Sequence, residues 1–145
     1  MKIGIMGGTF NPIHNAHLLI AEMAREEYGL DRVIFITDGN PPHKSANVTA
    51  KQRFEMTHIA IADNSAFEED DFEINRSEKS YTVNTLGYLK EKYPNNDLFF
   101  IIGEDSLNDF DKWYKPDKIL EMCSLLVFPR KSLKSLTETI KAVKE

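Results

Sequence analysis

Close to its amino terminus the chain reads Gly7-Gly8-Thr9-Phe10-Asn11-Pro12-Ile13-His14-Asn15-Ala16-His17, and this stretch decides the fold. The apolar run over residues 2–6 predicts a buried strand before it, and the good helix formers after it predict a helix over residues 16–28. The stretch is therefore a turn from a strand into a helix, where two glycines allow the backbone to bend sharply and to approach a ligand closely. The free N–H groups of the first helical turn favour a phosphate. His14 and His17 lie three residues apart, so both can meet one phosphate from the same face of the helix.

A second apolar run, over residues 32–37, predicts another strand. Two strands joined by a helix of this length form a βαβ unit, which indicates a parallel sheet. The loop over residues 38–44 contains two prolines and lies beyond the carboxyl end of the second strand, where ligands of open α/β sheets bind. This loop presents His43 and Lys44, which are both possible phosphate donors, although the loop alone is weak evidence of function.

The rest of the chain continues the alternation of helices and strands. We expect helices over residues 50–63, 116–122 and 135–145, a helix that ends at Lys92, and strands over residues 72–74, 98–102 and 125–128. Thr49 is expected to cap the first of these helices, and Ser80 or Thr82 is expected to cap the helix that ends at Lys92. The acidic run over residues 68–71 is interpreted as a solvated turn in preference to a metal site.

The strand over residues 98–102 is the most apolar and is expected at the centre of the sheet. Gly103-Glu104-Asp105-Ser106 follows it directly, again at the ligand-binding edge. An ionised Asp105 can accept two hydrogen bonds from ribose hydroxyls, and it can also cap the helix that follows.

Length and composition restrict the possible classes of protein. A chain of 145 residues with 41% hydrophobic residues is predicted to form a single domain over residues 1–145. No apolar run is long enough to span a membrane, and the amino terminus shows no signal-peptide pattern. The single cysteine, Cys123, excludes an internal disulfide, is expected to be a small buried side chain, and suits a cytoplasmic protein. The net charge of −5 argues against nucleic acid as a partner, so an anionic ligand needs a local cationic site.

The opening stretch resembles the T-x-x-H-x-G-H signature of the nucleotidyltransferase superfamily, in its G-G-T-F-x-P-I-H form, with Ala16 in place of the usual glycine. A G-x-G-x-x-G loop does not occur in the sequence, which argues against a dehydrogenase. The later segments resemble the bacterial nicotinate mononucleotide adenylyltransferases, from Ile3 to Arg130. The segments that occur in the order of that branch are Pro42-His43-Lys44, Ser80-Tyr81-Thr82, Asn84-Thr85-Leu86, Gly103-Glu104-Asp105-Ser106-Leu107, Trp113 and Arg130.

This resemblance implies a doubly wound, Rossmann-like α/β fold with a parallel sheet. It also implies transfer of the adenylyl group of ATP to nicotinate mononucleotide, with Mg²⁺, to give nicotinate adenine dinucleotide and pyrophosphate. Because the attacking phosphate is already ionised, the protein supplies positioning and charge stabilisation, and no general base is needed.

The resemblance also implies roles for individual residues, none of them as a metal ligand. His14 and His17 are the catalytic candidates. ATP is expected to contact Gly7, Gly8, Thr9, Phe10, His14, His17, Gly103 and Asp105. The mononucleotide is expected to contact Lys44, Thr82, Thr85, Trp113, Tyr114 and Arg130, with Trp113 stacked on the pyridine ring.

Other functions stay open at this point. A phosphopantetheine adenylyltransferase would share the histidine motif, but it would not be expected to carry all the later segments together. A non-catalytic or weakly active nucleotide-binding module is a second alternative. A nucleic-acid-binding protein is disfavoured by the net charge of −5.

The carboxyl-terminal part departs from the resemblance. Members of this branch continue with a further strand and a Ser-Thr-x-x-Arg element that binds the triphosphate, and residues 131–145 show neither. We therefore expect the chain to be incomplete at its carboxyl terminus and to turn over poorly. We also expect it to form a homo-oligomer through an exposed edge of its sheet.

Overall fold

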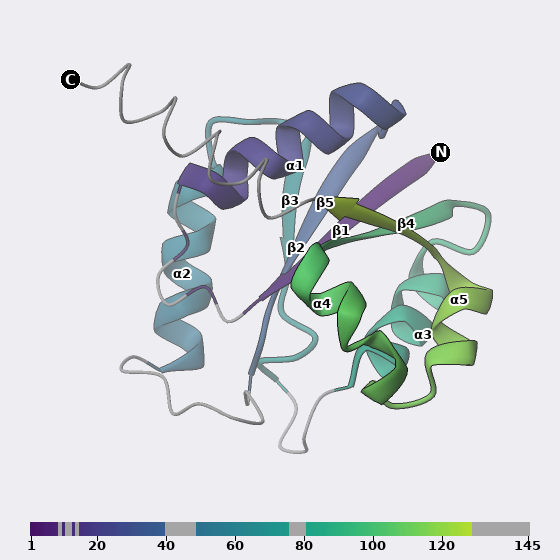
Figure 1. Ribbon diagram of the computed structural model, residues 1–145. Coiled ribbons are helices and arrows are strands. Elements are labelled where there is room, and N and C mark those ends of the chain that lie inside the picture. The colour runs from purple at the N-terminus through teal and green to yellow at the C-terminus, as the bar shows by residue number, and fades with distance from the viewer. Residues whose placement is uncertain (9, 11–12, 14, 40–48, 76–80, 129–145) are drawn as a thin grey trace.

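The computed structural model describes residues 1–8, 10, 13, 15–39, 49–75 and 81–128 (Figure 1). The elements follow in the order β1 (Lys2–Gly8), α1 (Asn15–Tyr28), β2 (Arg32–Thr37), α2 (Ala50–Ile61), β3 (Phe67–Asp70), α3 (Thr82–Lys92), β4 (Asp97–Gly103), α4 (Glu104–Asn108), the 3-10 helix η1 (Phe110–Lys112), α5 (Pro116–Met122) and β5 (Ser124–Phe128). The strands form a parallel five-stranded sheet in the order β3-β2-β1-β4-β5. Within these ranges, no helix combines the length and the apolar character needed to cross a membrane.

Both faces of the sheet are covered, because residues of its inner strands alternate between two hydrophobic clusters. In β2, Val33 and Phe35 pack in the cluster with α1 and α2, whereas Ile34 and Ile36 pack in the cluster with α3 and α5. Figure 1 shows these two pairs of helices on opposite sides of the sheet. A strand buried on both faces needs apolar residues at successive positions, which is why the continuous run over residues 32–37 predicted it. The predicted doubly wound α/β fold is confirmed.

The order of the strands places the opening stretch at the middle of the sheet. The chain moves outward from β1 through β2 to β3, and it then crosses to the other side of β1 to form β4 and β5. The carboxyl ends of β1 and β4 therefore flank the point where the strand order reverses, and open α/β sheets bind ligands in the crevice there.

The prediction that the strand over residues 98–102 lies at the centre is wrong. This strand is β4, which lies between β1 and β5, and β1 is the central strand. The apolar pattern reports burial on both faces of an interior strand, and it does not distinguish one interior strand from another.

The third strand also differs from its prediction. The acidic run forms most of β3, and residues 72–75 form a turn where a strand was predicted. The carboxylates of this edge strand find partners on other elements. Glu68 pairs with Arg32 of β2 at 2.8 Å, and Asp70 accepts a hydrogen bond from Lys92 Nζ of α3 at 2.9 Å. Charged side chains on an edge strand are also a common protection against pairing with other chains.

The two predicted helix caps have different outcomes. Thr49 caps α2 as predicted, because its Oγ1 accepts from the Gln52 N–H at 3.1 Å while Gln52 Oε1 accepts from the Thr49 N–H at 3.0 Å. The cap of α3 is Tyr81, which makes no side-chain bond there, so Thr82 is the first helical residue and not the cap. Ser80 lies outside the described residues.

The remaining predictions concern the end of the chain. The helix predicted over residues 135–145 lies outside the described residues.

Cys123 is half-buried against the cluster on the α3 and α5 side, and its Sγ donates to the carbonyl oxygen of Ile119 at 3.4 Å. Burial raises the pKa of this thiol to about 11, as expected for a structural and unreactive cysteine.

The position of β3 can be tested with neighbouring aspartates. Asp70→Ala is expected to lower the free energy of unfolding by about 2 kcal/mol, because this buried carboxylate accepts from Lys92, Tyr88 and the Phe72 N–H. Asp71 is exposed, so Asp71→Ala is expected to cost less than about 0.5 kcal/mol. Urea unfolding of both variants makes the comparison, and equal losses would contradict the placement of the acidic run in the sheet.

Candidate functional site

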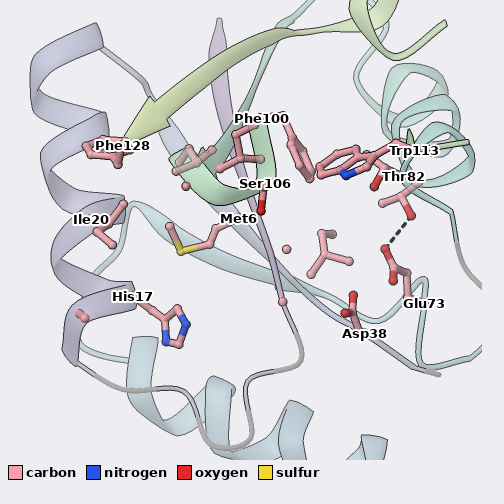
Figure 2. A pocket seen from close by; sticks show the side chains of 18 residues that line it. Met6, His17, Ile20, Asp38, Glu73, Thr82, Phe100, Ser106, Trp113 and Phe128 are labelled. Carbon is pink, nitrogen blue, oxygen red and sulfur yellow. Dashed lines mark hydrogen bonds between the residues drawn. The ribbon is translucent and has the colours of Figure 1, made fainter. Parts of the chain in front are cut away.

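A cavity of about 440 Å³ opens at the carboxyl ends of β1 and β4. Figure 2 shows it between His17 of α1 on one side and Thr82 and Trp113 on the other. Its lining includes Gly7, Gly8, His17, Thr82, Thr85, Gly103 and Trp113, which were all predicted as site residues. The fold therefore brings widely separated segments of the sequence into one cavity.

His17 forms the α1 wall and is supported from the core by Phe10. The two rings meet edge to face, with centroids 5.2 Å apart and planes at 83°. Phe10 is 3% exposed and also packs against Phe35 of β2, with centroids 6.1 Å apart. Its backbone has a φ of 49°, which is uncommon for a residue other than glycine. The ring of Phe10 is not among the side chains that line the cavity, so its contact with ATP stays a prediction.

The same ring explains one of the two glycines. A Cβ on Gly8 would lie 3.0 Å from Phe10 Cε1, so a larger residue would displace the ring that supports His17. At Gly7 the nearest atom would be 3.9 Å away, which is an ordinary contact. Packing therefore favours glycine at position 8, as would any approach of a phosphate.

Trp113 forms the opposite wall. Its indole is half-buried and packs against Phe110 of η1 at 5.0 Å and against Phe100 of β4 at 6.1 Å between centroids. These contacts fix the ring while part of it faces the cavity beside Thr82 (Figure 2). The position suits a stacking residue, and stacking itself stays a prediction.

Two further predicted residues lie outside the cavity lining. Tyr114 is 48% exposed and packs against Tyr81, with ring centroids 4.7 Å apart. Asp105 is exposed in the first turn of α4, and the next residue, Ser106, lines the cavity instead. Asp105 does not cap α4, because Gly103 occupies the cap position.

The remaining predicted residues cannot be placed. Thr9, His14, Lys44 and Arg130 lie outside the described residues, so their roles stay predictions. In the described part of the chain, no group of three or more His, Cys, Asp or Glu side chains is arranged to hold a metal ion.

Two carboxyl groups that were not among the predicted site residues also line the cavity. Asp38 follows β2, Glu73 lies in the turn after β3, and their carboxyl groups lie close to each other. Glu73 Oε2 also accepts from Thr85 Oγ1 at 2.7 Å, and Arg53 Nη1 donates to the carbonyl oxygen of Asp38 at 2.6 Å. Burial raises the pKa of Asp38, and this effect outweighs the opposing effects of the Glu73 bond and the Arg53 charge. We call these four residues the acid cluster.

One signal in the sequence could have located these carboxyl groups. Each follows the carboxyl end of a strand, where ligand-binding residues of α/β sheets gather. This signal did not identify Glu73, because the third strand was predicted over residues 72–74 and Glu73 was therefore expected inside a strand and not after one.

The sequence is similar to a known protein family and to individual curated proteins. A family model described as cytidylyltransferase-like matches residues 5–144. A relative from Citrifermentans bemidjiense, named "probable nicotinate-nucleotide adenylyltransferase", is 47% identical over 144 residues, which cover 97% of this chain and 67% of the relative. A relative of the same name from Pelobacter propionicus is 51% identical over 132 residues, which cover 90% of this chain and 61% of the relative. The chain thus spans roughly two thirds of the length of these curated relatives.

Solved structures share the fold. A candidate nicotinate-nucleotide adenylyltransferase from Vibrio parahaemolyticus gives a TM-score of 0.75 at 26% identity, covering 94% of this chain and 78% of that chain. The nicotinic acid mononucleotide adenylyltransferase of Plasmodium falciparum, complexed with NaAD, gives a TM-score of 0.76 at 23% identity, covering 92% of this chain and 70% of that chain. At 23% identity the likeness supports the fold alone.

Two glycines provide a matched test of the packing around the acid cluster. A Cβ on Gly39 would lie 2.2 Å from the backbone oxygen of Glu73, so Gly39→Ala is expected to lower the free energy of unfolding by about 2 kcal/mol. Gly87 lies inside α3 with no atom within 4 Å of its added Cβ, so Gly87→Ala is expected to stabilise by up to about 1 kcal/mol. Denaturant unfolding measures both, and a stabilised Gly39→Ala variant would show that the two loops are not in this contact.

Proposed function

This chain belongs to the nicotinate-nucleotide adenylyltransferases, within the wider cytidylyltransferase-like family, and we propose that it transfers the adenylyl group of ATP to nicotinate mononucleotide. The products are nicotinate adenine dinucleotide and pyrophosphate, and the reaction belongs to NAD biosynthesis. The relatives are longer than this chain, so the activity of these 145 residues is itself part of the proposal.

The observation that carries the proposal is the pair of unlike walls across one cavity. His17 and the two glycines that end β1, Gly7 and Gly8, offer donors of the kind that bind phosphate. The indole of Trp113, held by Phe100 and Phe110, offers a flat apolar surface of the kind that receives an aromatic ring. A ring bound at one wall and a phosphate bound at the other would place the attacking phosphate of a mononucleotide near the α-phosphate of ATP.

The chemistry needs positioning more than proton transfer. The 5′-phosphate of the mononucleotide is ionised at neutral pH and can attack without a base, and pyrophosphate leaves with its electron pair. The protein has to align the two phosphates and to offset the charge that develops at the α-phosphate. In our proposal His17 donates to an oxygen of that phosphate, and the first-turn N–H groups of α1 assist it.

We propose Mg²⁺ as the metal that accompanies ATP. The ion would neutralise phosphate charge, and it usually binds through phosphates and waters with one or two carboxylates. The carboxyl groups in the described part of the cavity lining belong to Asp38 and Glu73, and Glu73 already accepts a hydrogen bond from Thr85. The ion is therefore expected to arrive with the phosphates of ATP.

The proposed reaction is tested by measuring pyrophosphate release from ATP and Mg²⁺ with three acceptors. Nicotinate mononucleotide is expected to give release, because an anionic ring substituent suits the uncapped first turn of α3. Nicotinamide mononucleotide is expected to react with a kcat/KM at least about tenfold lower. Phosphopantetheine is expected to give none. Release with phosphopantetheine, or no release with any acceptor, would reject the proposal.

The role of His17 has a matched control on the surface. His17→Ala is expected to lower kcat about a hundredfold, because one donor to the developing charge is lost. His58 of α2 has a side chain that is 68% exposed, pairs with Glu69 and lies outside the cavity lining, so His58→Ala is expected to keep full activity. Steady-state kinetics compares the variants after circular dichroism shows that both are folded. Near-normal turnover of His17→Ala would remove this residue from the mechanism.

A further inference from the structure

Glu73 lies where several segments of the chain meet at the cavity. It is 9% exposed, and its carboxyl group accepts a hydrogen bond from Thr85 of α3 and lies close to Asp38, which follows β2. Arg53 of α2, which is 2% exposed, donates in turn to the backbone of Asp38. The acid cluster therefore joins the turns after β2 and β3 to two helices.

The backbone of Glu73 is fixed as closely as its side chain. Gly39 leaves no room for a Cβ, since that atom would lie 2.2 Å from the oxygen and 2.8 Å from the carbonyl carbon of Glu73. The loop after β2 thus packs directly on the turn after β3. The segment after β2 therefore contacts both parts of Glu73, because Gly39 packs on its main chain and Asp38 lies close to its carboxyl group.

The bond to Thr85 fixes a helix end that has no side-chain cap. Tyr81 occupies the cap position of α3 without a capping bond, and the Thr85 N–H donates to its carbonyl oxygen at 3.2 Å. Thr85 is 2% exposed, and Thr82 in the same turn lines the cavity beside Trp113. The position of Glu73 therefore determines where this part of the wall stands.

The charges of the acid cluster suit an anionic ligand. Burial raises the pKa of the Asp38 carboxyl, which favours its neutral form, so the two acids together carry less negative charge than two free carboxylates. The guanidinium of Arg53, which stays protonated in proteins, offsets that charge. Both effects lower the repulsion between this wall and an anionic ligand, although two acids line it.

We propose that Glu73 is the positioning residue of the mononucleotide wall, through its bond to Thr85 of α3 and the packing of its backbone on Gly39. The inference rests on the proposed function, because it assigns the Trp113 side of the cavity to the pyridine ring. Figure 2 shows Glu73 and Asp38 across the cavity from His17. Loss of Glu73 should therefore weaken mononucleotide binding and leave the reaction of bound substrates unchanged.

The test compares Glu73→Ala with Glu73→Gln in steady-state kinetics. Glu73→Ala is expected to raise the KM for nicotinate mononucleotide about tenfold, with kcat and the KM for ATP within about threefold of the unmodified chain. Glu73→Gln is expected to restore the KM to within about threefold, because its amide oxygen can accept from Thr85 and its NH₂ group can donate to Asp38.

Glu68→Ala serves as the control. Glu68 lies on the same strand-and-turn segment but pairs with Arg32, the first residue of β2, at the edge of the sheet away from the cavity. This variant is expected to keep both KM values. An unchanged mononucleotide KM in Glu73→Ala would overturn the inference, and so would equal rises in both KM values or a folded Glu73→Gln variant as weak as Glu73→Ala.

Quenching of Trp113, the single tryptophan, by nicotinate mononucleotide separates this inference from the proposed function. If the unmodified chain binds the mononucleotide without turnover, the proposed activity fails, and the same variants are compared by their Kd values with the same expectations. If the chain shows neither turnover nor quenching, both proposals are rejected. A chain that is fully active but indifferent to Glu73→Ala rejects the positioning role alone.

Discussion

The packing of the Phe10 ring is the contact on which the phosphate side of the cavity depends. Its left-handed backbone costs about 1 kcal/mol for a residue with a side chain, and burial of the ring contributes about 2 kcal/mol in return. The ring fills the space that the missing side chain of Gly8 leaves, and its edge supports the imidazole of His17. The first turn of α1 is thus supported from the core, and the imidazole of His17 lines the cavity.

The topology of the sheet supplies the second constraint. Because all of its strands are parallel, Gly8 at the end of β1, Asp38 after β2, Glu73 after β3 and Gly103 at the end of β4 come to one edge. The strand order reverses between β1 and β4, and the cavity opens there. This arrangement separates a wall with phosphate-type donors from a wall with an aromatic surface. Such a separation suits a reaction in which an aromatic ring binds at one wall while the phosphate of the same molecule is joined to a second phosphate at the other wall.

The sequence predicted those parts of the fold whose patterns are local. The apolar runs located β1, β2, β4 and β5, because strands buried on both faces need apolar residues throughout. It failed at β3, because Glu68 and Asp70 are paired with Arg32 and Lys92, which come from other elements. The same reason explains why the acid cluster was not predicted. The burial of Arg53 and the contact between Asp38 and Glu73 arise only after β2, α2 and β3 have packed.

For the candidate site too, the sequence located some residues correctly and others not. The histidine motif located His17 and its glycines correctly at the cavity, since a strand-to-helix turn carries its own geometry. Trp113 was also located there. Tyr114 and Asp105 are each adjacent in sequence to a residue that lines the cavity, but they do not line it themselves, and Tyr114 packs against Tyr81. Adjacent residues leave a short helical turn in different directions, and packing decides which of them reaches the cavity.

The most direct test of the account is a crystal structure of this chain with nicotinate adenine dinucleotide bound. The account predicts that the pyridine ring lies against the indole of Trp113, beside Thr82, and that the pyrophosphate lies within hydrogen-bond distance of His17. A dinucleotide bound in this cavity with its pyridine ring away from Trp113, or bound outside the cavity, would contradict it.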